Sequence, residues 1–206
     1  SQTRLLLPAF ERGAEDASHA LSRWLGRPIL LAVSEVDLVD LADAADVLGP
    51  AEAMVASCTM ELSGRLTGQL LMTFEDAAGL ALADILLNRP AGTSTSWGEL
   101  EQSAANETAN IVGCAFLNSL AAHLPLADAP GHDAPLVPSP PVFRHEFAAA
   151  LLEFALMDQA VEADRVLLVK SRFTSDGSEL QWLLLFVPTG EAIRALATCL
   201  APPKVP

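Results

Sequence analysis

The chain has 206 residues, 51% of them apolar, and a formal net charge of −14 at pH 7. The composition is that of a globular protein, and 26 acidic residues against 12 basic ones argue against nucleic acid and anionic membranes as partners, because both attract positive charge. No apolar run approaches the roughly 20 residues that span a bilayer, and no secretory signal pattern is present. Three cysteines lie far apart in apolar segments, as buried reduced thiols do. We therefore expect a cytoplasmic protein.

The first part of the chain predicts a helix, a strand, a hairpin and a second helix. Apolar residues at helical spacing indicate a helix over residues 8–25, closed by Gly26 and Pro28. Residues 29–41 are strand-like, and an Ala- and Asp-rich connection follows at 42–50. The next elements expected are a hairpin with strands at 54–62 and 66–74 around Ser63-Gly64, and a helix from Glu75-Asp76 to Leu87.

The second part is expected to begin with a long helix, residues 97–123. Ser96 is its expected N-cap, and Glu99 three residues later completes a capping box. Six prolines follow within residues 125–141, and their density excludes regular structure there. The remaining elements expected are a helix at 143–159, strands at 165–174 and 180–187 around an Asp176-Gly177 turn, and a last helix at 190–200.

The two parts resemble each other. Residues 66–87 and 180–200 both consist of a strand, a short turn with a glutamate and an amphipathic helix. A partner strand across a glycine turn precedes each of them, and a long helix begins each half. This repeat predicts an α/β (α+β) fold of two pseudo-symmetric halves, about 1–90 and 91–206, that share one β-sheet with the long helices packed on it. Since no linker separates the halves, we expect a single domain over residues 1–206.

The helix at 97–123 carries a polar stripe of unusual composition. Each asparagine inside a helix costs about 0.5 kcal/mol relative to alanine, and this helix has no Lys or Arg. Glu107 and Asn110 are three residues apart, so they lie side by side on the helix surface. From spacing alone, a solvated helix face is the ordinary interpretation, and a functional face is the alternative that the composition raises. The members of the stripe are Glu99, Gln102, Ser103, Asn106, Glu107 and Asn110.

Familiar catalytic and metal-binding patterns are missing from the sequence. There is no P-loop, no Gly-x-Gly-x-x-Gly after a strand, no His-Glu-x-x-His and no Gly-x-Ser-x-Gly. His132-Asp133 stands in the proline-rich segment without companion ligands, so we expect no metal site. Cys114 has no cationic neighbour and is interpreted as a packing residue. Any chemistry would therefore use groups lent to another molecule's site.

One combination of motifs carries a family resemblance. Ser103-x-x-x-Glu107-x-x-Asn110, followed after a proline-containing loop by Pro138-Ser139-Pro140-Pro141, resembles the signature of the CheC family of chemotaxis phosphatases (the CheC/CheX/FliY superfamily). The stretches ALSRWLGRP, SEVDLVDL, GRLTGQLLMTF and LLLFVPTGEAIRALA agree with the same family, so the resemblance covers nearly the whole chain.

The resemblance implies a CheC-like fold and hydrolysis of the phosphoryl-aspartate of a CheY-type receiver domain in two-component signalling. It implies that Asn110 orients the attacking water, that Glu107 pairs with the receiver's active-site lysine, and that Ser103 and Asn106 bind beside them. The protein would need no cofactor of its own, because the receiver supplies Mg²⁺. The alternative is a non-catalytic module that binds a receiver domain, the deamidase CheD or a flagellar-switch component.

Three departures from the family pattern affect these expectations. Aligning Ser119 with Ala20 shifts the halves by 99 residues and places Pro8 and Glu11 where Glu107 and Asn110 stand, so the first of two possible sites is degenerate. A carboxylate at that position would repel a phosphoryl group. The loop at 126–137 is longer than usual, and its role is open. The usual glycine before the asparagine is Ala109, a change that favours helix.

Overall fold

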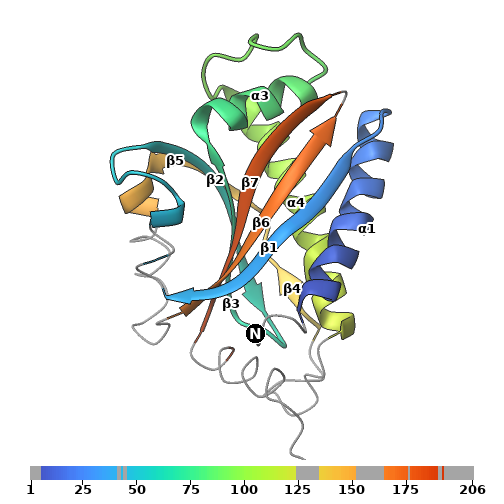
Figure 1. Ribbon diagram of the computed structural model, residues 1–206, viewed down its shortest axis with the longest axis vertical. Coiled ribbons are helices and arrows are strands. Elements are labelled where there is room, and N and C mark those ends of the chain that lie inside the picture. The colour runs from blue at the N-terminus through green and yellow to red at the C-terminus, as the bar shows by residue number, and fades with distance from the viewer. Residues whose placement is uncertain are drawn as a thin grey trace, which may run out of the picture.

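The computed structural model describes residues 6–40, 43, 46–123, 135–151, 165–175, 177–189 and 192. It is a mixed α+β fold in which helices pack on a curled antiparallel sheet (Figure 1). The described elements are α1 (Leu7–Leu25), β1 (Leu30–Asp40), β2 (Met54–Ser63), β3 (Gly68–Glu75), α3 (Asp76–Leu86), α4 (Glu99–His123), β4 (Val137–Pro138), β5 (Val142–Phe147), β6 (Arg165–Ser175) and β7 (Ser178–Pro188).

The sheet is symmetric in its strand order. The order is β1-β6-β7-β3-β2-β4, and β5 also pairs with β2. With β5 taken as the strand beside β2, exchanging β1 with β5, β2 with β6 and β3 with β7 gives the same order read from the opposite edge. The halves therefore meet where β3 pairs with β7, from Gly68↔Pro188 to Thr73↔Leu183. The predicted fold of two pseudo-symmetric halves sharing one sheet is confirmed.

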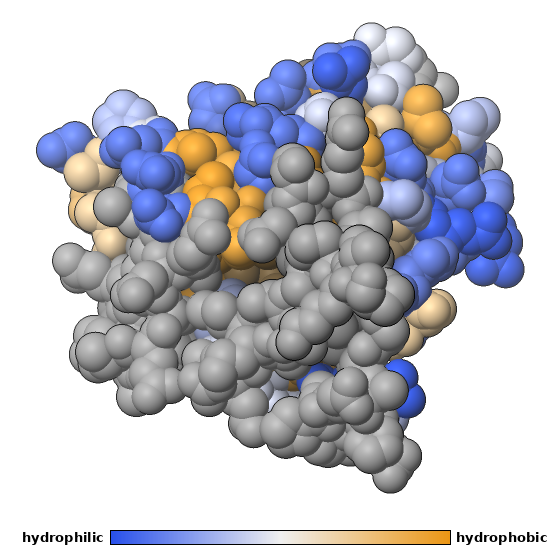
Figure 2. All heavy atoms as spheres, turned by 60° about the horizontal axis from the view of Figure 1, so that its bottom comes forward, coloured by the Kyte–Doolittle hydropathy of each residue, from blue (hydrophilic) through white to orange (hydrophobic). Residues whose placement is uncertain are grey.

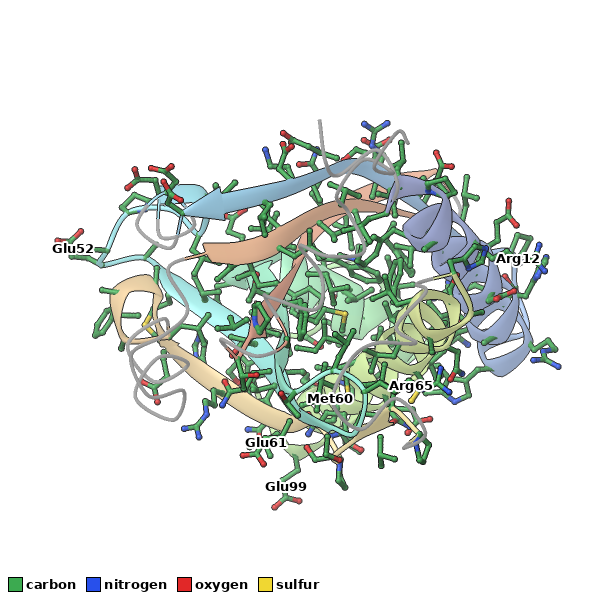
Figure 3. The ribbon with its side chains drawn as sticks, turned by 90° about the horizontal axis from the view of Figure 1, so that it is seen from below. Arg12, Glu52, Met60, Glu61, Arg65 and Glu99 are labelled. Carbon is green, nitrogen blue, oxygen red and sulfur yellow. The ribbon has the colours of Figure 1, made fainter. Side chains whose placement is uncertain are left out.

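Helices α1 and α4 run in opposite directions side by side inside the curve of the sheet (Figures 1 and 3). The rings of Phe10 and Phe116 lie 5.6 Å apart at the contact between the two helices. A Cβ atom on Gly13 would lie 2.9 Å from the backbone Cα of Phe116, so glycine permits this close approach. On the sheet side of α4, a Cβ atom on Gly113 would overlap Met60 of β2. The two glycines thus set how deeply α4 is buried between α1 and the sheet.

The sheet buries apolar residues on both faces. One face packs under α1, α3 and α4 and includes Phe74, Phe173 and Trp182. The opposite face carries a second cluster of buried residues, among them Leu71 and Leu185. Figure 2 shows the end of the molecule that lies at the bottom of Figure 1, where an apolar area is bordered by hydrophilic residues.

Trp97 anchors the start of α4. Its indole Nε1 donates a hydrogen bond of 2.7 Å to Asp76 Oδ1 on α3, and its ring lies 4.8 Å from that of Phe143 on β5. A Cβ atom on Gly79 would lie 2.7 Å from the indole, so α3 needs a glycine there. His145 Nε2 is 2.9 Å from Asp76 Oδ1, within ion-pair distance but not aligned for a hydrogen bond. These contacts tie α4 to both α3 and β5.

A polar cluster fixes the loop that leads into α4. Buried Asp84 accepts the backbone N–H groups of Thr93 at 2.9 Å and Ser94 at 2.8 Å. Burial alone would raise the pKa of Asp84, but these hydrogen bonds outweigh it and hold the pKa below its usual value. Glu101, on the first turn of α4, pairs with Arg89 at 2.5 Å. The loop and the helix start are therefore held by charge-assisted hydrogen bonds.

Most of the predicted elements are confirmed, with ends shifted by one or two residues. The helix predicted over 97–123 begins at Glu99, and its first turn is closed by the Gln102 N–H donating to the Gly98 carbonyl. The capping box expected at Ser96 is therefore wrong, because a helix that begins at Glu99 has Gly98 at its N-cap position and Ser96 two residues before it. The helix predicted at 190–200 lies outside the described residues, except for Ala192.

Two expectations for the segment after α4 are wrong. The helix predicted at 143–159 begins instead as strand β5, whose residues pair with β2 from Thr59↔Val142 to Met54↔Phe147. Helical residues follow at 148–151, and residues 152–159 lie outside the described part. Regular structure also enters the proline-rich stretch, since β4 pairs through Pro138 with Leu62. A proline is tolerated there because β4 is a short edge strand.

We predict that Gly13→Ala destabilises the protein by about 1–3 kcal/mol, the usual cost of overpacking. On an open helix surface the same change would stabilise by up to about 1 kcal/mol, because alanine is the better helix former. Urea unfolding gives the free energy, with Glu11→Ala on the exposed side of α1 as the control. A stabilised Gly13→Ala variant would contradict the close approach of α1 and α4.

We predict that Asp84→Asn destabilises the protein by about 1–3 kcal/mol at neutral pH, because an amide has one oxygen and can accept only one of the two N–H groups that the buried carboxylate accepts. The folded-state pKa of Asp84 lies below 3.8, so its contribution is present above that pH and is lost as the pH falls through the folded value. Urea unfolding between pH 7 and pH 3 measures the free energy of unfolding. The difference in this free energy between wild type and variant should become smaller as the pH falls. A difference that does not change with pH would contradict this account.

Candidate functional site

An open groove of about 740 Å³ runs between α4 and the segment Pro138–Pro141. It brings together the two parts of the sequence that carry the family resemblance, although they are separated by the whole connection after α4. Its described lining residues are Glu99, Gln102, Ser103, Asn106, Glu107, Asn110, Cys114, Pro138, Ser139, Pro140 and Pro141.

The floor of the groove is one face of α4. Its residues recur every three or four positions, which places them on one side of a helix. Ser103 and Glu107 are exposed, whereas Asn106, Asn110 and Cys114 are half-buried. From Glu99 to Cys114 the helix rises about 22 Å. All four residues that sequence reasoning placed at the site, Ser103, Asn106, Glu107 and Asn110, therefore lie in one continuous groove.

The opposite wall is held on the edge of the sheet by Ser139. Its N–H donates to the Glu61 carbonyl at 2.8 Å, and its Oγ accepts the Glu61 N–H at 3.0 Å. The prolines on either side have no N–H to donate and fixed backbone torsions. Glu61 and Glu99 project on the same side of the molecule in Figure 3. One serine thus fastens a stiff proline wall beside α4.

Two side chains in the groove are held by hydrogen bonds from or to neighbouring residues, and a third has a buried oxygen without one. Cys114 Sγ lies 3.7 Å from Asn110 Oδ1 and donates to it. Gln102 Nε2 donates to the Trp97 carbonyl at 2.9 Å, so the anchored tryptophan also fixes this amide. Asn106 Oδ1 is buried and has no hydrogen-bond partner among the described residues. Burial raises the pKa of the Cys114 thiol, so it is protonated at neutral pH.

The groove presents hydrogen-bond acceptors and negative charge. The charged residues that line it are Glu99 and Glu107, both carboxylates. Among the described residues there is no group of three His, Cys, Asp or Glu side chains able to hold a metal ion. Within the same residues, no helix is long and apolar enough to cross a membrane. The groove thus combines two carboxylates with neutral amide and hydroxyl groups.

The corresponding face of α1 differs in its residues and in the loop beside it. Pro8 and Glu11, both exposed, occupy the positions equivalent to Glu107 and Asn110, and α1 begins only one residue before Pro8. The connection from α1 to β1 contains only residues 26–29, too short to supply a second wall, whereas α4 and β5 are joined by residues 124–141. The two helix faces therefore differ in the loop beside them as well as in the residues at the equivalent positions.

Sequence reasoning missed part of the lining. Cys114, expected to be a packing residue, lines the groove with its thiol facing Asn110. The i, i+4 spacing permits this contact but is too common on a helix to predict it. Glu99 and Gln102 belonged to the polar stripe but were given no role, and they form the far end of the groove. His132 and Asp133 lie outside the described residues.

Solved structures share this fold. FliY from Thermotoga maritima superposes with a TM-score of 0.73 at 15% identity, covering 97% of this chain and 95% of that chain. The FliM middle domain from H. pylori gives 0.66 at 11% identity, covering 95% and 97%. The chemotaxis protein CheX from Desulfovibrio desulfuricans gives 0.50 at 11% identity, covering 88% and 98%. No protein-family model and no curated protein matches the sequence.

At these identities the likeness shows the fold alone. It extends over nearly the whole chain and over nearly the whole of each neighbour. The resemblance carried by Ser103, Glu107, Asn110 and the Pro138–Pro141 segment points to the same group of proteins. The chain has the CheC/CheX/FliY-type chemotaxis fold.

Proposed function

We propose that this protein is a phosphatase that hydrolyses the phosphoryl-aspartate of a CheY-type receiver domain through the groove on α4. The observation that carries the proposal is the position of Glu107 and Asn110 in one groove with the Pro138–Pro141 wall. These are the two motifs of the resemblance, and the fold joins them at one surface.

Glu107 is suited to docking. It is exposed on the groove face, where its carboxylate can pair with the active-site lysine of a receiver. An exposed ion pair contributes only about 0.2–1 kcal/mol, but a docked interface that excludes water strengthens it. Ser103, one turn earlier, adds a hydroxyl to the same contact surface. Asn106 lines the groove beside them, with its side-chain Oδ1 buried.

Asn110 is suited to positioning water. Its carboxamide offers an acceptor and a donor on a rigid helix, and positioning supplies most of what a protein adds to phosphoryl transfer. The receiver would contribute the phosphoryl group and its Mg²⁺, so the carboxylates of the groove need hold no metal. Such an arrangement is catalytically incomplete without its partner.

A second candidate is a non-catalytic binding module. The larger TM-scores belong to FliY and FliM, and H. pylori FliM has been solved in complex with FliG. The degenerate α1 face fits this candidate too, because it shows that the fold persists here without one site. In this role the groove would bind a receiver, CheD or a flagellar-switch component and leave the phosphoryl group intact.

We predict that Asn110→Ala removes most of the acceleration of receiver dephosphorylation, by about tenfold or more, because a lost positioning group in a polar site costs about that much. Receiver domains from the source genome, phosphorylated with acetyl phosphate, provide the assay. Asn118→Ala is the matched control, since Asn118 is exposed on the same helix outside the groove. A wild type that does not shorten the phosphoryl lifetime, or an active Asn110→Ala variant, refutes catalysis.

We predict that Glu107→Lys weakens binding of a beryllofluoride-activated receiver by about tenfold at low salt and by less at high salt, because opposite charges become like charges. Titration calorimetry measures the dissociation constant without any turnover. Glu11→Lys makes the same charge reversal on the degenerate α1 face and should leave binding unchanged. Equal weakening by both variants would contradict a single working face.

A further inference from the structure

The carboxamide of Asn110 receives one hydrogen bond from the described residues, and Cys114 donates it. The distance from Cys114 Sγ to Asn110 Oδ1 is 3.7 Å. Helix side chains lean toward the N-terminus, so a thiol four residues later reaches back over the amide. Both side chains line the groove. The contact therefore lies inside the surface that the proposed function uses.

The direction of this hydrogen bond is fixed. Burial raises the pKa of the Cys114 thiol above its ordinary value, and the groove lining contains no cation that would favour a thiolate. The thiol is thus an S–H donor at neutral pH, and the amide oxygen is its acceptor. With Oδ1 as the acceptor of the thiol, Nδ2 is the amide atom left for another partner.

We propose that Cys114 is a positioning residue whose thiol holds the Asn110 amide in one of its two orientations. An asparagine amide can turn by 180° about its last side-chain torsion with little change in shape, which exchanges donor and acceptor. With Oδ1 held by the thiol, the groove keeps the N–H donors and the second lone pair of Oδ1. A turned amide would offer an acceptor where the bound water or phosphoryl oxygen needs a donor.

The consequence for rate rests on the proposed phosphatase function, whereas the hydrogen bond does not. Cys114→Ala should lower the kcat of receiver dephosphorylation by about two- to tenfold, the value of one neutral hydrogen bond. Its KM should stay unchanged, because Glu107 still docks the receiver. Cys114→Ser should retain the wild-type kcat, since a hydroxyl also donates to the amide.

A matched control separates this role from general packing. Cys58 is fully buried on β2, away from the groove lining, so Cys58→Ala removes a thiol without touching Asn110. That variant should keep the wild-type kcat and KM even if its stability falls. Equal kinetics for Cys114→Ala and wild type would overturn the inference, and so would a Cys114→Ser variant as slow as Cys114→Ala.

A spectroscopic measurement tests the hydrogen bond without any receiver. The S–H stretching band of Cys114 is obtained by Raman spectroscopy as the difference between wild type and Cys114→Ala. This band should move to higher wavenumber in Asn110→Ala, where the acceptor is gone, and stay in place in Asn118→Ala. An unchanged band in Asn110→Ala overturns the inference. A wild type that is inactive on receivers would refute the proposed function alone. The position of the S–H band would still test the hydrogen bond between Cys114 and Asn110.

Discussion

The burial of α4 between α1 and the sheet is the constraint on which the rest of the structure depends. Phe116 packs on Phe10 and over Gly13, and Gly113 lets the helix approach Met60 of β2. These contacts bury one side of α4. The face with Glu107 and Asn110 therefore faces the open groove beside β2. The edge of the same strand carries Ser139 and the proline wall. The groove is therefore a direct consequence of how α4 seats on the sheet.

The symmetry of the sheet makes the difference between the two halves easy to locate. Strands exchange without changing the order, yet the loops beside α1 and α4 differ. Pro8 and Glu11 stand where Glu107 and Asn110 lie in the other half, and the connection at 26–29 is much shorter than the one at 124–141. The two halves therefore share a scaffold and differ in the helix face and in the loop beside it.

Much of this could be predicted from the sequence, because hydrophobic periodicity fixed α1, α4 and the hairpins, and the internal repeat implied a shared sheet. The strand β5 was missed since Val142–Phe147 is too short and too exposed to show clear alternation, although the repeat already demanded a counterpart to β1. The spacing of Glu107 and Asn110 shows only that they share a helix face, and their expected roles come from the family resemblance. The thiol of Cys114 was missed because an i, i+4 contact between weak partners has no pattern of its own.

The central claim is that one face of α4, and not its counterpart on α1, meets the partner. Side-chain amide signals in a ¹⁵N NMR titration with a beryllofluoride-activated receiver domain test it most directly. The account predicts perturbed signals for Asn106 and Asn110, an unperturbed signal for Asn118 on the same helix, and unperturbed backbone signals around Glu11. Perturbation centred on Glu11, or none at Asn110 in a receiver that binds, would contradict it.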